Sequence, residues 1–138
     1  MSDIAALIPH QGAMCLLDRV LDWDADRIAC AARSHLDPAN PLRRAGGLAM
    51  LCGAEYALQA AALHGALRDG RAQPAGYVAA LRDLVLHAAR LDDPAWGELR
   101  VAARLERREG AGMVYALAVR TEDGAPLLDA RAVIAVPA

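Results

Sequence analysis

The sequence predicts an α+β fold in which one antiparallel sheet packs against one long helix. Three features of the chain lead to this prediction. Two strand-like runs come first, a long alanine-rich helical segment follows them, and several strand-like runs separated by turns fill the second half. Strands and a helix that are grouped along the chain in this way are typical of an α+β arrangement.

The first two strands are predicted at residues 13–23 and 26–35. Both runs mix apolar and polar residues, and the turn-like sequence DWDAD separates them, so they are expected to form a hairpin. The sequence LDPANPLRRAGG comes next. Its two prolines and two glycines disfavour regular structure and predict a loop over residues 36–47.

A single long helix is predicted over residues 48–67. This segment contains strong helix formers and no proline, and the sequence RDGRAQPAG after it supplies a stop signal. The helix is apolar nearly all round, which is typical of a buried helix. Residues three, four and seven apart share a side of a helix. One side of this helix is therefore predicted to carry Leu48, Leu51, Cys52, Glu55, Leu58 and Ala62.

The second half is predicted to contribute three or four more strands. Four segments contain stretches with apolar residues at every second position, within residues 75–91, 97–109, 112–124 and 125–138, and turn-like sequences separate them. The sequence ELRVAARLERRE has the alanine and arginine content of a helix. Its flanking turns and its repeated apolar alternation nevertheless favour a strand.

Two strands, one buried helix and several further strands correspond to the hotdog architecture, in which a sheet wraps around a central helix. The length fits one such domain, spanning residues 1–138. With 56% hydrophobic residues but no Phe, the core is expected to consist of Ala, Leu and Val. A sheet of this kind leaves an edge strand and apolar surface exposed, so we expect a dimer or an assembly of dimers.

The charge and the sequence pattern exclude several classes of protein. A formal net charge of -2 and a pI near 6.0 provide no broad basic surface for nucleic acid. The N-terminus has no basic region, and no stretch approaches the roughly 20 apolar residues that span a bilayer. The cysteines and histidines form no zinc-ligand pattern. We therefore expect a cytoplasmic protein without a metal site.

Glu55 is the only acid between Asp37 and Asp69, in a segment that is otherwise almost wholly apolar. A glutamate on a helix is most often a solvated surface group, but these surroundings favour burial. A carboxyl group that is removed from water has a raised pKa and can act as a general acid. Gln59 lies one turn further on, where its amide either orients this carboxyl or is an ordinary polar group of the helix.

His35 is predicted at the end of the second strand, from which its side chain can enter a cleft beside the helix. A lone histidine is more often structural than catalytic, but the isolated acid on the helix keeps a catalytic role open as the alternative. Gly46 and Gly47 precede the predicted helix. Their backbone amides can approach a carbonyl oxygen closely, with the helix dipole behind them, or they simply form a flexible start of the helix.

Three sequences in this order resemble a known family. IPHQGAMCLLDRV, HLDPANP and GAEYALQAAA resemble the β-hydroxyacyl-acyl carrier protein dehydratases of the hotdog superfamily, whose pattern is PH…LLxDRV, then HFPGxPxxPG, then ExxAQ. SHLDPANPLRR, GAEYALQAAALHGAL and GYVAALRDLVLHAARLDD are more closely similar to the predicted 3-hydroxyacyl-carrier-protein dehydratases of aryl polyene biosynthetic clusters. The resemblance runs from about residue 7 to the C-terminus.

The resemblance implies an activity and assigns roles to residues. Dehydratases of this family remove water from a 3-hydroxyacyl thioester on an acyl carrier protein and leave the trans-2-enoyl product. By this resemblance, His35 removes the C2 proton, and Glu55, contributed by a partner subunit, handles the departing hydroxyl. A backbone amide at Gly46 or Gly47 binds the thioester oxygen, and no cofactor is required. The expected partners are an acyl carrier protein with its phosphopantetheine arm and a second hotdog chain, identical or different.

The chain also departs from the family pattern. Ser34 and Leu36 replace the glycine and the aromatic residue that flank the family histidine, and the path to Glu55 is longer. Arg43 and Arg44 lie in this longer loop, where they either contact the phosphopantetheine phosphate or an acidic carrier surface, or remain solvated. Two alternatives stay open: a hotdog thioesterase that uses a carboxylate to activate water, and a noncatalytic subunit that supports a second hotdog protein.

Overall fold

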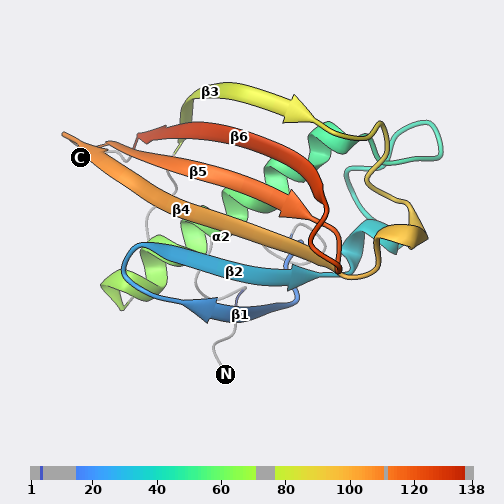
Figure 1. Ribbon diagram of the computed structural model, residues 1–138, viewed down its shortest axis with the longest axis horizontal. Helices are drawn as coiled ribbons and strands as arrows, with labels where there is room; N and C mark the ends of the chain where they lie inside the picture. Colours follow the sequence, from blue (N-terminus) through green and yellow to red (C-terminus); the bar gives the residue numbers. More distant parts are fainter. Residues whose placement is uncertain (1–3, 5–14, 71–76, 111, 136–138) are drawn as a thin grey trace.

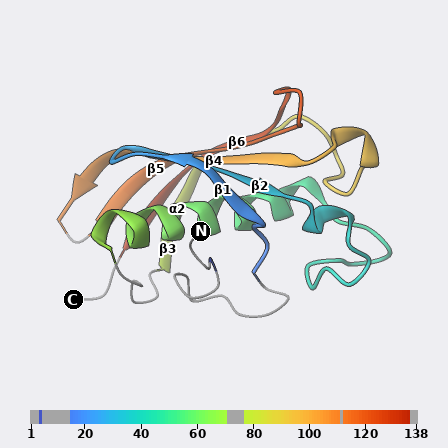
Figure 2. The same ribbon diagram turned by 90° about the horizontal axis from the view of Figure 1, so that it is seen from below.

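The computed structural model describes residue 4 and the ranges 15–70, 77–110 and 112–135. Within these residues, six strands form one sheet in which every neighbouring pair is antiparallel. The order across the sheet is β1-β2-β4-β5-β6-β3, and the long helix α2 lies against one face (Figure 1 and Figure 2). The strands are β1 (Arg19–Trp23), β2 (Arg27–Ala32), β3 (Tyr77–Leu86), β4 (Leu99–Glu109), β5 (Gly112–Arg120) and β6 (Pro126–Ala135).

Helix α2 (Gly53–Asp69) follows a short 3-10 helix, η3 (Met50–Cys52), and packs mainly against β4 and β5. Its many alanines are buried and allow the helix to approach the sheet closely. Gly70 ends the helix in a left-handed backbone conformation, with φ 73°, which glycine adopts without the steric cost of a side chain. Among the described residues, no helix is long and apolar enough to cross a membrane.

The core lies between α2 and the covered face of the sheet. Alternate strand residues point toward the helix and are buried, such as Val101 and Ala103 in β4 and Leu117 and Val119 in β5. The core is built mostly from Ala, Leu and Val, as the composition predicts. The apolar residues that recur at every second position of these strands therefore lie on the face of the sheet that α2 covers.

The structure confirms the predicted hotdog arrangement and corrects the ends of the first two strands. The first strand begins at Arg19, and residues 15–18 have no strand structure, while the first two residues of the predicted strand lie outside the described part of the chain. The second strand ends at Ala32, because its neighbour β4 begins at the opposite residue, Leu99. The prediction that this strand extends to residue 35 was wrong.

The predicted helix over residues 48–67 is also shifted. The backbone N–H of Met50 donates to the Ala89 carbonyl at 3.0 Å, and the N–H of Leu91 donates to the Leu48 carbonyl at 2.8 Å. Because these bonds keep residues 48 and 49 extended, helical structure begins only at Met50. The ambiguous sequence ELRVAARLERRE lies in β4, so the choice of a strand was correct.

Strand β3 forms one edge of the sheet and carries a row of exposed apolar side chains. One side of β3 pairs with β6, and no described strand pairs with its other side. Its large apolar side chains are between 37% and 49% exposed: Val78, Leu81, Leu84, Val85 and Leu86. The exposed apolar edge that the sequence predicted is therefore present, and it lies at β3 (Figure 1).

Candidate active site

His35 lies in a short 3-10 helix, η2 (Ser34–Leu36), just after β2. Its side chain is fully buried, and both ring nitrogens lack a hydrogen-bond partner within the described residues. Burial lowers the pKa of His35 because it disfavours the charged imidazolium, and the Gly97 backbone and the carboxylates of Asp18 and Asp92 only partly oppose this effect. Buried polar atoms without partners are rare, so this neutral imidazole calls for a functional explanation.

A chain of side-chain hydrogen bonds holds the turn that carries His35. The Ser34 hydroxyl donates to the Leu16 carbonyl at 2.8 Å and lies 2.8 Å from the Tyr56 hydroxyl. The Asn40 amide donates to the Tyr56 hydroxyl at 3.0 Å and to the Ser34 carbonyl at 2.9 Å. Since the single hydroxyl hydrogen of Ser34 goes to Leu16, the Tyr56 hydroxyl is the donor in its bond to Ser34.

The sequence analysis did not single out Tyr56 or Asn40. Tyr56 is fully buried and is among the largest buried side chains, in a helix made mostly of Ala and Leu. Asn40 is also buried, in a loop with a proline directly after it. An isolated tyrosine in an apolar helix and an asparagine in a proline-rich loop are the available signals, because both side chains need hydrogen-bond partners when they are buried.

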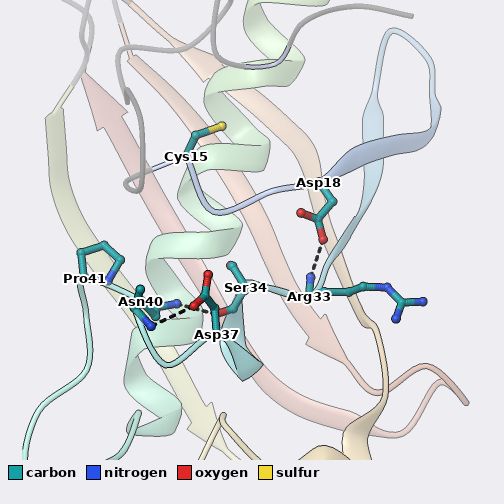
Figure 3. Close-up of a pocket in the computed structure, with 8 residues that line it drawn as sticks. Cys15, Asp18, Arg33, Ser34, Asp37, Asn40 and Pro41 are labelled. Atoms are coloured by element: carbon teal, nitrogen blue, oxygen red, sulfur yellow. Dashed lines mark hydrogen bonds between the residues drawn. The ribbon is translucent and has the colours of Figure 1, made fainter.

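A buried carboxylate, Glu98, anchors the residue just before η2. It accepts hydrogen bonds from Arg19 at 2.6 and 2.8 Å, from Arg33 at 3.0 Å and from Arg100 at 2.6 Å. These guanidinium groups, Arg19 first among them, lower the pKa of Glu98 to about 2. The backbone N–H of Arg33 also donates to the Asp18 carboxylate at 2.6 Å (Figure 3). Arg33 is therefore held through both its side chain and its backbone.

Glu55 lies in the first turn of α2 and is half-buried. It shares one stripe of the helix with Leu51, which is 50% exposed, and with the half-buried Leu58 and Ala62. The sheet covers the opposite side of the helix, so the carboxyl is less buried than the sequence predicted. The hydrogen bond between residues 34 and 56 places the turn of α2 that carries Glu55 beside the turn that carries His35.

Gln59 lies one turn after Glu55 and is fully buried. Its side-chain oxygen accepts a hydrogen bond from the Leu16 backbone N–H at 2.9 Å. The Leu16 carbonyl receives the Ser34 hydroxyl, so the segment before β1 is attached to both α2 and η2. Gln59 thus supports the segment that borders the His35 turn, and its predicted contact with substrate stays a prediction.

Gly46 and Gly47 lie in a tight turn that is separate from the helix. The backbone groups of Arg44 and Gly47 exchange two hydrogen bonds, at 2.9 and 3.0 Å, and Gly46 has φ 78°. A Cβ atom on Gly47 would lie 2.9 Å from the Arg90 guanidinium, so this position is also closely packed. The expectation that the helix dipole stands directly behind the two glycines was wrong, because helical structure starts at Met50.

Arg43 and Arg44 both bind groups near their own loop. Arg43 donates to the Asp37 carbonyl at 3.0 Å and lies 3.4 Å from the Asp92 carboxylate. Arg44 donates to two carbonyls of the same loop, at 3.1 and 2.7 Å. Asp92 is bound mainly by Arg90, which holds its pKa far below the usual range. The predicted contacts of the two loop arginines with a phosphate or a carrier protein stay predictions.

A cavity of about 340 Å³ borders the turn that carries His35 (Figure 3). Cys15 and Asp18 line it from the segment before β1, and Arg33, Ser34 and other residues of the following loop line it from the opposite side. Hydrogen bonds from Arg33 to Asp18 and from Ser34 to Leu16 join these two sides of the cavity at the His35 turn. Within the described ranges, no three His, Cys, Asp or Glu side chains are grouped closely enough to hold a metal ion.

The chain is similar to a known protein family and to several solved structures. A family model described as ApeP-like, ApeP dehydratase, matches residues 2–138. A search of curated proteins gave no match. Among solved structures, the chain is similar to one from the dehydratase heterocomplex ApeI:P of Xenorhabdus doucetiae, with a TM-score of 0.85 and 14% sequence identity. That alignment covers 100% of this chain and 93% of the other.

Two further solved structures share the fold at lower similarity. AziG from S. sahachiroi has a TM-score of 0.62 and 15% identity, with 89% of this chain and 91% of the other covered. A mutant of thioesterase PA1618 from Pseudomonas aeruginosa has a TM-score of 0.63 and 17% identity, with 87% and 81% covered. At such identities these structures establish the fold alone. The family match instead confirms the resemblance that the sequence predicted, and the protein belongs to the ApeP-like family of dehydratases.

Proposed function

We propose that this protein dehydrates a 3-hydroxyacyl thioester, carried on an acyl carrier protein, to the trans-2-enoyl thioester during aryl polyene or fatty acyl chain assembly. Membership of a dehydratase family supports this type of reaction. The observation that carries the assignment of the base is the buried His35 imidazole, whose nitrogens have no partner in the described part of the chain. A neutral, unpaired imidazole is suited to accept a proton from carbon.

The proposed reaction moves one proton to His35 of one subunit and one from the helix carboxylate that the other subunit contributes, which is Glu55 where that subunit is a second copy of this chain. The imidazole takes the C2 proton, the C2–H electron pair forms the C2–C3 double bond, and the C3–O bond breaks. The departing hydroxyl takes a proton from this carboxyl group and leaves as water. Return of the proton from His35 to the carboxylate through solvent restores both groups.

The loop over residues 36–47 supplies the other proposed substrate contacts. Negative charge builds up on the thioester oxygen during proton removal, and one hydrogen-bond donor at that oxygen is worth about 10²–10³ in rate. Gly46 is the better candidate for this donor, because the Gly47 N–H already donates to the Arg44 carbonyl. We assign the carrier phosphate or the acidic carrier surface to Arg43 and Arg44, and the exposure of Arg44 supports such a contact.

We further propose that a second hotdog chain completes the site. Glu55 lies on the least buried stripe of α2, so a partner that packs on this stripe brings Glu55 close to its own residues. The unpaired, apolar edge of β3 provides a surface for that partner, because two such edges can pair and continue the sheet. The similar Xenorhabdus doucetiae chain comes from a heterocomplex, which favours a different hotdog chain over an identical one.

A mass measurement tests the proposed reaction. A 3-hydroxyacyl carrier protein is incubated with the protein alone and with a candidate hotdog partner, and the mass of the acyl carrier is recorded. Loss of one water with the wild type but not with His35→Ala supports dehydration through His35. Activity in the mixture alone supports the two-chain site, and reciprocal substitutions in the two chains then identify the source of each catalytic group.

A hotdog thioesterase is the second candidate, because thioesterase PA1618 shares the fold. The same measurement separates the two activities, since a thioesterase releases the free carrier protein instead of removing water. A mixture that stays fully active with His35→Ala and Glu55→Gln in this chain would instead identify it as a supporting subunit. An unchanged acyl group in every mixture would contradict both proposed activities.

A further inference from the structure

We propose that Tyr56 and Asn40 are positioning residues that hold His35 in the orientation required for proton transfer. This inference rests on the proposed function of His35 as the base. Its starting point is the imidazole, because neither ring nitrogen has a hydrogen-bond partner among the described residues. The Gly97 backbone interacts with the ring closely enough to oppose the lowering of its pKa in part, but it makes no hydrogen bond of good geometry with either nitrogen. The angle of the ring is therefore set mainly by the backbone of the turn and by packing.

The backbone bonds of η2 close the turn without attaching it to the rest of the molecule. The Leu36 N–H donates to the Arg33 carbonyl at 3.0 Å, and the Asp37 N–H donates to the Ser34 carbonyl at 3.1 Å. A 3-10 helix has poorer hydrogen-bond geometry than an α-helix, and a single turn of it has little stability of its own. An external attachment is therefore needed to fix the position of the imidazole.

Arg33 and Ser34 are already bonded to Asp18, Glu98 and Leu16 on one side of the turn. Tyr56 adds an attachment from the buried side of α2. Its hydroxyl donates to the Ser34 hydroxyl at 2.8 Å and accepts from the Asn40 amide at 3.0 Å. Asn40 uses its other amide hydrogen on the Ser34 carbonyl and accepts from the Leu42 N–H at 2.9 Å. The chain before His35 and the loop after it are thus both bonded to one point on a helix.

The place of Tyr56 in the sequence has a further consequence. Tyr56 directly follows Glu55, so its bond to Ser34 joins the first turn of α2 to the turn of the proposed base within one chain. Ser34 stands where the resembling dehydratases have glycine, which has no hydroxyl to accept this bond. The departure from the family pattern is therefore matched by a contact in the folded protein, and the same contact positions His35.

Tyr56→Phe tests the proposal, with Tyr115→Phe as its matched control. Each substitution removes one hydroxyl from a fully buried tyrosine, and the Tyr115 hydroxyl is bonded to a different histidine, His64, at 2.7 Å. Both variants should lose similar stability. In the active complex, only Tyr56→Phe should lower kcat, by about 10-fold to 10²-fold, with KM nearly unchanged, because a slightly misplaced base slows the chemical step.

The pH profile of kcat/KM gives a readout that loss of stability alone would not move. If the turn loosens, water reaches His35, and its pKa rises toward the ordinary histidine value of about 6.5. The acid limb of the profile, where kcat/KM falls as His35 is protonated, then shifts to higher pH. Asn40→Ala should move the limb in the same direction. Tyr115→Phe should leave it in place.

Equal kcat losses in Tyr56→Phe and Tyr115→Phe, or an acid limb that does not move, would overturn the positioning role. Full activity in His35→Ala would overturn the proposed function instead. NMR titration of the His35 ring makes the same comparison without turnover. A pKa that rises in Tyr56→Phe and not in Tyr115→Phe supports the proposal even if the substrate is different, and an unchanged pKa in both variants contradicts it.

Discussion

Two fully buried histidines, His35 and His64, differ in the hydrogen bonds that their rings make. His64, within α2, has a partner at each ring nitrogen: the Asp24 carbonyl at 2.9 Å and the Tyr115 hydroxyl at 2.7 Å. His35 has no described partner at either nitrogen. Burial lowers the pKa of both, so burial and charge do not distinguish them. Their hydrogen bonds do.

The two bonds of His64 also determine its hydrogen positions. A carbonyl oxygen only accepts, so Nε2 carries the hydrogen and donates to Asp24, and Nδ1 accepts from the Tyr115 hydroxyl. Because these partners lie in the turn between β1 and β2 and in β5, His64 joins the first hairpin and the middle of the sheet to α2. A neutral imidazole satisfied at both nitrogens stabilises the fold, whereas the His35 nitrogens, which have no partner among the described residues, are in the state that the proposed role as a base requires.

The largest effect is expected from His35→Ala. Loss of a general base lowers the rate of dehydration by about 10²–10⁴-fold. The rate is followed as loss of water from the acyl carrier protein, in the presence of the hotdog partner if one is required. As the control, His64→Ala should retain kcat under conditions in which it is folded. An equal loss of kcat in the folded His64 variant would contradict the assignment of the base to His35 rather than to His64.

For stability, by contrast, substitution of His64 is expected to have a larger effect than substitution of His35. His64→Leu leaves the hydroxyl of the buried Tyr115 without its acceptor, at a cost of about 1–3 kcal/mol. It also removes the donor to the Asp24 carbonyl, which belongs to an exposed residue, so the cost there is smaller. His35→Leu strands no described partner and should cost less. Urea unfolding at neutral pH compares the variants, with a lower midpoint and an unchanged slope expected for His64→Leu. A larger loss for His35→Leu would contradict the assignment of structural and chemical roles.

Both histidines should make stability depend on pH in the same direction. Their pKa values are lower in the folded state than the usual 6.5, so the unfolded chain binds protons more readily. Their contribution is complete above pH 6.5 and is lost as the pH falls from 6.5 toward the folded pKa values. The slope is at most about 1.4 kcal/mol per pH unit for each histidine.

Urea unfolding between pH 5 and pH 8 measures this dependence, and each Leu variant should remove part of the slope. The carboxylate of Glu98 does not interfere, because its pKa is lowered from 4.5 to about 2 and its contribution is lost only at more acidic pH. A stability that stays constant across this range in the wild type would contradict the lowered pKa of both histidines.

The smallest effect is expected at the end of α2, after His64. Gly70→Ala places a side chain on a left-handed residue, with φ 73°, where the added Cβ atom meets nothing within 4 Å. The cost is therefore conformational, about 1–2 kcal/mol, and kcat should not change. A substitution that leaves the unfolding midpoint unchanged would show that the helix end rearranges.

The order of the elements could be predicted because it depends on local pattern. The alternation of apolar residues in β4, β5 and β6 indicates strands with one covered face, and the alanine-rich segment without proline indicates a helix. The end of β2 could not be predicted in the same way. It depends on where β4 begins, at Leu99, and this residue is distant in the sequence.

The residues of the candidate site likewise divide into those that the sequence could identify and those that it could not. His35 and Glu55 could be selected from the sequence, because an isolated acid in an apolar helix and a histidine beside a proline-rich loop are local features that also match a family pattern. Tyr56 and Asn40 could not, since their roles depend on bonds to each other and to Ser34 across the fold.

Local composition and periodicity were therefore enough to predict a hotdog fold and to select two catalytic candidates, because each of these features is encoded by neighbouring residues. Folding was needed to distinguish His35 from His64. The partners of His64, Asp24 and Tyr115, come from opposite halves of the chain, and only packing of the sheet on α2 brings them to its ring. The same packing leaves the His35 nitrogens without a described partner, because hydrogen-bond satisfaction is a property of the assembled core.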